Sequence, residues 1–138
     1  MNAGRDELLA TWNACGYYRL VGMEVLRADE DGSAFRIEIA EPHLQAYGTG
    51  HGGVLAGLVD AAMGLAVLGR LPAGEGCATI EMKLNFTAAA RPGELRAEGR
   101  VLHEGRRIVT AAAEARDPAS GLVAVGQGTF QRFALRPG

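Results

Sequence analysis

Apolar and polar residues alternate along much of the chain, which is the pattern of β-strands that bury one face. The clearest runs are 35–39 and 80–86, where Ile, Leu, Met and Phe alternate with charged or amide side chains. We predict further strands at 18–28, 94–103, 106–116 and 121–133. The last two are separated by the turn sequence DPASG, which favours a hairpin and therefore antiparallel pairing.

Two segments depart from this alternation and predict helices. Residues 5–14 carry acidic residues near their start and place three large apolar residues on one stripe. Residues 52–69 form the one long apolar segment without alternation, which is typical of a buried helix. This segment is about one turn too short for a typical membrane span and carries Asp60 near its centre, so we expect no membrane span. The pattern predicts an α+β fold with one long central helix against a sheet of five or six largely antiparallel strands.

Composition narrows the class of protein. A length of 138 residues suits one domain that spans 1–138. The formal net charge is −2, whereas a typical nucleic-acid-binding protein has an excess of basic residues, so the composition does not favour nucleic-acid binding. Two cysteines without CxxC spacing, and a start without a secretory signal pattern, favour a reduced, cytoplasmic protein. The three histidines have no HExxH spacing, so we expect no metal site.

Asp60 is the only charged residue in the segment 52–69. At 100° per residue it lies opposite the stripe that contains Leu58 and Leu65, among small residues. No Lys or Arg lies three or four positions away to pair with it. A solvated surface carboxylate is the alternative. However, this face carries no other polar side chain, so we expect a subunit or a ligand to cover it, which makes Asp60 a candidate functional residue.

The sequence GHGG at 50–53 lies at the start of the same predicted helix. Because the chain has 20 glycines, a Gly-Gly pair is expected by chance. The position of this pair at the start of the helix is therefore more informative than the pair itself. Gly52 and Gly53 leave backbone N–H groups open at the positive end of a helix, where an oxyanion can bind. Asp60 lies eight residues further, about 12 Å along the axis. One helix cannot bring both groups to one carbonyl, whereas two antiparallel helices from two subunits can, so we expect a dimer.

These residues match a known signature of the approximate form N-x-x-G-x-x-H-G-G with an acid seven residues later. The matching positions are Gln45, Gly48, His51, Gly52, Gly53 and Asp60. The chain therefore resembles the hotdog-fold acyl-CoA thioesterases of the phenylacetate-pathway (PaaI-type) branch, and the order of its elements agrees over nearly the whole length. The resemblance implies a central helix wrapped by the sheet and a homodimer with two sites, often assembled further into a homotetramer as a dimer of dimers.

The resemblance also implies a role for each matching residue. Asp60 would be the general base or the nucleophile toward the thioester carbonyl. The Gly52 N–H of the partner subunit would hold the thioester oxygen, and His51 would shape that turn. Thr79 matches a hydroxyl position that helps to hold water. Gln45 stands where the family usually has Asn, so its reach toward a water differs by one methylene.

Other candidates would contact the substrate. Arg106 and Arg107 are expected to bind coenzyme A phosphate, or else to form only a charged hairpin turn. Gly53, Met63 and Phe86 are candidates for binding the rest of the substrate. The predicted function is hydrolysis of an acyl-CoA thioester to free acid and coenzyme A, without a metal or redox cofactor. A non-catalytic acyl-CoA-binding sensor module is the alternative, and a hotdog dehydratase fits the spacing less well.

Overall fold

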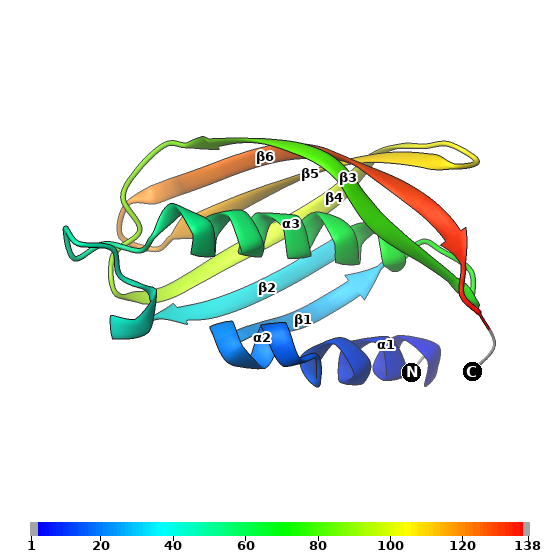
Figure 1. Ribbon diagram of the computed structural model, residues 1–138, viewed down its shortest axis with the longest axis horizontal. Coiled ribbons are helices and arrows are strands. Elements are labelled where there is room, and N and C mark those ends of the chain that lie inside the picture. Colours follow the sequence, from blue (N-terminus) through cyan, green and yellow to red (C-terminus); the bar gives the residue numbers. More distant parts are fainter. Residues whose placement is uncertain (1–2, 137–138) are drawn as a thin grey trace.

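Six strands form one antiparallel sheet, and the longest helix lies along its inner face (Figure 1). The computed structural model describes residues 3–136. The elements follow in the order α1 (Ala3–Asn13), α2 (Gly16–Val21), β1 (Met23–Asp29), β2 (Gly32–Ile39), the 3-10 turn η1 (Glu41–His43), α3 (Gly52–Leu68), β3 (Glu75–Phe86), β4 (Gly93–Glu104), β5 (Ile108–Asp117) and β6 (Gly121–Ala134). The strand order is β1-β2-β4-β5-β6-β3, so β1 and β3 are the edge strands. This confirms the predicted α+β architecture.

α3 packs against the sheet through a wide apolar arc that includes the predicted leucine stripe. Two residues of the sheet hold the helix close. Ser33 on β2 donates a buried hydrogen bond of 2.6 Å from Oγ to the carbonyl oxygen of Ala62. Gly99 on β4 makes room for the same carbonyl, because a Cβ at this position would lie 2.2 Å from that oxygen. These contacts fix the height of α3 above the sheet and therefore the place of Asp60.

The first strand begins later than the sequence pattern indicated. Tyr18 and its neighbours form α2 instead, and Gly22, with φ +82°, ends this helix before β1 starts at Met23. The ring of Tyr18 is buried, with its centroid 5.6 Å from those of both Trp12 and Phe35. Burial of this aromatic side chain outweighs the β-propensity of the Tyr-Tyr sequence, which is a local preference only.

A β-bulge in β3 decides which of its side chains face α3. The pairing with β6 shifts register between Thr79 and Glu81, which leaves Ile80 as the extra residue. Odd-numbered side chains before the bulge and even-numbered ones after it therefore share the helix side. These residues are Cys77, Thr79, Met82, Leu84 and Phe86. The unbroken alternation predicted for 80–86 was wrong at Ile80, which is 54% exposed.

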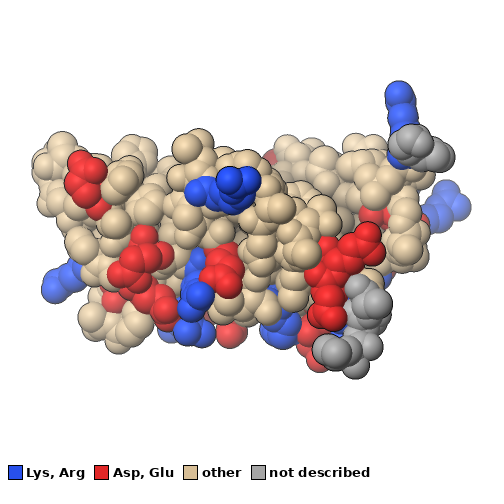
Figure 2. Space-filling model, turned by 90° about the horizontal axis from the view of Figure 1, so that it is seen from below, with Lys and Arg blue, Asp and Glu red and all other residues tan. Residues whose placement is uncertain are grey.

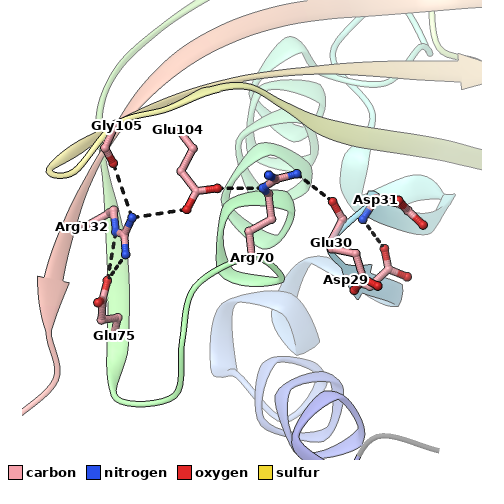
Figure 3. A network of polar contacts seen from close by, with 8 residues as sticks. All are labelled: Asp29, Glu30, Asp31, Arg70, Glu75, Glu104, Gly105 and Arg132. Carbon is pink, nitrogen blue, oxygen red and sulfur yellow. Dashed lines mark hydrogen bonds and ion pairs between the residues drawn. The ribbon is translucent and has the colours of Figure 1, made fainter.

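A network of ion pairs and hydrogen bonds joins several elements at one end of the molecule (Figure 3). Arg132 on β6 donates from Nη2 to Glu75 (2.7 Å) and from Nη1 to Glu104 (3.3 Å). Glu104 also accepts from Nε of Arg70 at 2.8 Å, and Nη1 of Arg70 donates to the carbonyl oxygen of Glu30 at 3.0 Å. The network thus connects β6, β3, β4, the end of α3 and the β1–β2 turn.

Acidic and basic side chains are interspersed on the face shown in Figure 2. The described residues form ion pairs on neighbouring or alternate strand positions, such as Arg36–Glu24 and Arg96–Glu94 (2.7 Å each). Such exposed pairs each stabilise the fold by only about 0–1 kcal/mol. Among residues 3–136, no helix is long and apolar enough to cross a membrane.

Candidate active site

The start of α3 has one backbone N–H group that lacks an acceptor. His51 is the N-cap residue, since its Nδ1 accepts a hydrogen bond of 2.8 Å from the N–H of Gly53 and its carbonyl accepts one of 3.0 Å from Val54. The N–H of Gly52 has no acceptor within residues 3–136. A free N–H at the positive end of a helix is suited to bind an oxyanion. The predicted donor Gly52 is therefore open, whereas the N–H of Gly53 is already used.

Gln45 folds its side chain back onto the loop that precedes α3. Its Nε2 donates to Thr49 Oγ1 at 2.8 Å, and its Oε1 accepts from the backbone N–H of Tyr47 at 2.8 Å. Both ends of the amide are thus engaged inside the loop. A water-holding role for Gln45 remains a prediction and would use the second N–H or the second lone pair of this amide.

Asp60 and Thr79 are in direct contact. Thr79 Oγ1 donates a hydrogen bond of 2.7 Å to Asp60 Oδ1. The second oxygen, Oδ2, keeps its acceptor positions for a water or a substrate. Asp60 is only partly buried, and in the described part of the chain it forms no ion pair. The fold therefore brings a hydroxyl from β3 to a carboxylate that no cation neutralises.

The helix surface around Asp60 is made of small residues and bordered by two other elements. We name Gly57, Asp60 and Gly64 the Asp60 strip, and each of them is partly exposed. Tyr17 of α2 places its hydroxyl against Gly57, where a Cβ would lie 2.3 Å from the hydroxyl oxygen. Cys77 of β3 places its Sγ 3.7 Å from the carbonyl oxygen of Gly64. α2 lies beside the β1 edge of the sheet and β3 is the other edge, so the strip is bordered from both edges (Figure 1).

Two neighbours of Asp60 are held in their neutral forms. Burial first, and then the negative charge of Asp60, raise the pKa of the Cys77 thiol to about 11. Burial, followed by the influence of Cys15 and of Asp60, raises the pKa of Tyr18 above its usual value. Neither group supplies an anionic nucleophile near neutral pH. A cysteine mechanism at this site therefore has no support from the electrostatics.

The predicted substrate contacts on α3 and β3 differ in their positions. Phe86 is 54% exposed and packs its ring over Gly52, where a Cβ would lie 3.3 Å from Cζ. An apolar ring thus lies beside the free N–H. Met63, in contrast, is fully buried against β6, with Cε 3.2 Å from a Cβ built at Gly128. Met63 is thus a buried core residue, because the buried arc of α3 is wider than the leucine stripe alone, and its contact with the substrate stays a prediction.

Arg106 and Arg107 are exposed in the turn between β4 and β5. Arg132 holds this turn. Its Nη1 donates to the carbonyl of Gly105 at 3.4 Å (Figure 3). Its backbone N–H donates to the carbonyl of Arg107 at 2.8 Å. Neither Arg106 nor Arg107 forms an ion pair within residues 3–136. Both guanidinium groups are therefore accessible to solvent, and their binding of a phosphate stays a prediction.

One hollow of the surface lies away from the candidate residues. A hollow of about 340 Å³ lies among β4, β5 and the β5–β6 turn, and none of the candidate residues lines it. In the part of the chain that the structure describes, no group of three or more His, Cys, Asp and Glu side chains is arranged to hold a metal ion.

Comparison with known proteins now places this geometry in a family. The family model of the thioesterase superfamily matches residues 47–124, more than half of the chain, including all of α3 and β3. The chain belongs to the thioesterase superfamily. The segment of this chain that matches the family model contains Gly52, Asp60 and Thr79.

Individual relatives of this thioesterase-superfamily chain agree over most of its length. A Halobacterium salinarum protein named as a candidate esterase is 33% identical over 129 residues, covering 86% of this chain and 85% of the relative. The solved structure of a conserved Pseudomonas aeruginosa protein is 36% identical, with a TM-score of 0.82 over 86% of this chain and 94% of the other. The E. coli PaaI protein has a TM-score of 0.85 over 95% of both chains at 19% identity, which shows the fold alone. The predicted hotdog fold is confirmed.

Sequence reasoning missed Tyr17 and Cys77, although both border the Asp60 strip of this thioesterase-superfamily chain. The signal that could have found them is the position of Gly57 and Gly64, roughly one turn before and after Asp60. Glycine inside a helix is unfavourable, so it often marks a close approach by another element. The identity of the approaching residues needed the tertiary structure.

Proposed function

We propose that this protein hydrolyses acyl-CoA thioesters to free acid and coenzyme A, as a PaaI-type thioesterase. The observation that carries the proposal is the 2.7 Å hydrogen bond between Thr79 and Asp60 on a helix whose Gly52 N–H is free. Acyl transfer needs a base or nucleophile and a donor for the oxyanion, and these groups can supply both. Membership of the thioesterase superfamily supports thioester hydrolysis, and the motif resemblance supports coenzyme A as the thiol.

In the proposal, two protomers contribute to each site. Gly52 and Asp60 are eight residues apart on α3, which corresponds to about 12 Å along the helix. β3 is an edge strand, and Ile80 and Phe86 on it are each 54% exposed. Addition of an antiparallel β3 from a second copy would cover this edge. The two-fold symmetry of such a homodimer sets each Gly52 N–H against the partner's Asp60 and creates two sites, and a dimer of dimers is the larger assembly.

The chemistry can follow either of two routes. In the first, Asp60 removes a proton from a water, whose oxygen attacks the thioester carbonyl. In the second, the carboxylate attacks the carbonyl carbon itself, and water later cleaves the resulting anhydride. In both routes the C–S bond breaks and coenzyme A leaves as a thiolate that takes up a proton. The Gly52 N–H stabilises the oxyanion, and Thr79 orients the carboxylate of Asp60.

The other candidate residues have supporting roles in this proposal. His51 caps α3 and thereby aims the Gly52 N–H, while Gln45 organises the preceding loop. Phe86 offers an apolar surface next to that donor. Arg106 and Arg107 bind the phosphates of coenzyme A from the β4–β5 turn. The proposed chemistry of Asp60 and the Gly52 N–H needs neither a metal nor a redox cofactor.

The proposal is tested by thiol release from a panel of aromatic, short-chain and medium-chain acyl-CoAs. Asp60→Asn keeps the size of the side chain, and we expect it to lower kcat by about 10²–10⁴-fold. Glu98→Gln, an exposed change on β4, is the matched control and should leave the rate unchanged. Equal rates for the wild type and Asp60→Asn would contradict the role of Asp60. Tight binding of an acyl-CoA without thiol release would instead support a sensor module.

A further inference from the structure

We infer that Tyr17 of α2 is a specificity-determining residue, which limits the bulk of the acyl group beside Asp60. The inference rests on the proposed function, because it concerns the same site. Its basis is the contact between Tyr17 and Gly57, which lies one helical turn before Asp60 on the same side of α3.

The two consecutive tyrosines of α2 have different surroundings. Tyr18 is 4% exposed and packs between Trp12 and Phe35 in the core. Tyr17 is 49% exposed and brings its hydroxyl to the backbone of Gly57. Its side chain therefore covers part of α3 without belonging to the core. A residue that half covers the helix next to a candidate catalytic carboxylate is placed to contact a ligand of that carboxylate.

The two glycines of the Asp60 strip differ in how closely other side chains approach them. A Cβ at Gly57 would lie 2.3 Å from the Tyr17 hydroxyl oxygen, so this position cannot take a side chain unless Tyr17 moves. A Cβ at Gly64 would have its nearest contact with Phe130 at 3.6 Å, an ordinary van der Waals distance. The strip is thus more crowded at Gly57, where Tyr17 lies, than at Gly64. An acyl group at Asp60 would meet the aromatic ring of Tyr17 on the Gly57 side.

The main chain around Tyr17 is firmly anchored. The side chain of Asn13, just before α2, donates to the carbonyl of Val25 at 3.0 Å and accepts from its N–H at 2.9 Å. The core packing of Tyr18 fixes the next residue of the helix. The main chain at Tyr17 is therefore held in place, and the Tyr17 ring should favour compact acyl groups over long or branched ones.

The test compares kcat/KM for straight-chain acyl-CoAs from acetyl to dodecanoyl. Tyr17→Ala should raise the ratio of kcat/KM for the longest to the shortest substrates by about tenfold. Tyr17→Phe retains the ring and should keep the wild-type ratio. Gly57→Ala displaces the Tyr17 ring, so as a single change it should alter the ratio of kcat/KM between long and short substrates. Added to Tyr17→Ala, it should have little further effect on this ratio. Leu20→Ala, on the same helix and 84% exposed, is the matched control and should change nothing.

The outcomes separate this inference from the proposed function. If Asp60→Asn abolishes hydrolysis but Tyr17→Ala keeps the wild-type ratio, the function stands and the inference is overturned. If the wild type hydrolyses no acyl-CoA, the proposed function fails, and calorimetry with non-hydrolysable acyl-CoA thioethers then decides about Tyr17. If Tyr17→Ala shifts the ratio of Kd values between short-chain and long-chain thioethers by about tenfold in favour of long chains, the inference about Tyr17 is supported. An unchanged Kd ratio overturns it.

Discussion

Thr79 Oγ1 on β3 donates a 2.7 Å hydrogen bond to Asp60 Oδ1 on α3, across 19 residues of sequence. The bulge at Ile80 places Thr79 and Met82 on the same side of β3. Thr79 can therefore contact Asp60 while the apolar side chains after the bulge, from Met82 onward, also face α3. A hydrogen bond to a charged acceptor also holds the carboxylate in one orientation. The local irregularity of the strand thus serves the candidate site.

Thr79→Val should lower kcat by about tenfold or more, because it removes the donor to Asp60 while keeping the shape of the side chain. KM should change little, since Thr79 is proposed to orient the carboxylate and not to bind the acyl group. Thr79→Ser restores a hydroxyl and should recover most of kcat. Steady-state kinetics of the three proteins checks this. Full activity in Thr79→Val would show that the hydrogen bond has no part in catalysis.

Cys77 should react slowly with iodoacetamide at neutral pH, because its pKa of about 11 leaves little thiolate. The alkylation rate should rise with pH up to about 11. Asp60→Asn removes the negative charge that opposes the thiolate, so it should lower the pKa of Cys77 and speed up alkylation. Mass spectrometry in a Cys15→Ser background isolates the reaction of Cys77. A rate that is the same with and without the charge of Asp60 would argue against their proximity.

Asp117 should make the stability of the protein depend on acidic pH. A hydrogen bond of 2.7 Å from the N–H of Ala119, helped by Arg91 and Ser120, holds the pKa of the buried Asp117 carboxyl below its usual value. A pKa lowered by folding means that the stabilisation is complete above the unfolded-state pKa, about 3.9, and is lost as pH falls through the folded-state pKa.

Asp117→Asn should therefore lower the free energy of unfolding at pH 7 by about 1–3 kcal/mol. The difference from the wild type should shrink as the pH falls below about 4, because protonation removes the same charge from the wild type. Urea unfolding at several pH values measures both effects. A difference that stays constant down to the lowest pH would contradict the lowered pKa.

Gly57→Ala and Tyr17→Phe should be coupled in their effects on stability. Gly57→Ala alone should cost about 1–3 kcal/mol, because the new methyl group meets the Tyr17 hydroxyl at 2.3 Å. Without the hydroxyl, the nearest Tyr17 atom is Cζ at 3.4 Å, so the same change should be neutral or stabilising by about 1 kcal/mol through helix propensity. A double-mutant cycle of unfolding free energies checks this, and purely additive effects would show that Tyr17 simply swings aside.

The sequence predicted the parts of the fold that depend on local periodicity, including α3 with its central Asp60 and most of the strands. The misplaced features depend on tertiary contacts. Tyr18 became helical because its ring is buried, and Ile80 left the apolar row because of a bulge. The family resemblance assigned Asp60 and Thr79 to one site, but their direct hydrogen bond was not predicted, since no periodicity connects a helix residue to a strand residue 19 positions away.

Ile80→Lys should weaken the homodimer, because it places a charge on the exposed apolar edge of β3 that a second copy is proposed to cover. Thiol release should fall together with the fraction of dimer, since each site needs two protomers. Leu20→Lys, at another exposed apolar position, is the control and should remain dimeric. Sedimentation velocity and activity at matched concentrations check this, and a fully active monomer would contradict the shared site.

The most direct test of the shared site mixes two inactive variants. Gly52→Pro removes the proposed donor N–H at the first helical position, where proline is tolerated, and His51, with φ −62° and ψ 139°, already has the extended conformation that precedes proline. Asp60→Asn removes the carboxylate. If each site combines Gly52 of one protomer with Asp60 of the other, a mixed dimer contains one intact site and one site with both changes.

Thiol release should therefore reappear after the two variants are unfolded, mixed in equal amounts and refolded together. With random pairing, half of the dimers are mixed and each has one intact site, so activity should reach about a quarter of the wild-type value per protomer. Each variant refolded alone should remain inactive. A mixture in which dimers exchange, shown by native mass spectrometry, but which releases no thiol would contradict a site built from Gly52 of one subunit and Asp60 of the other.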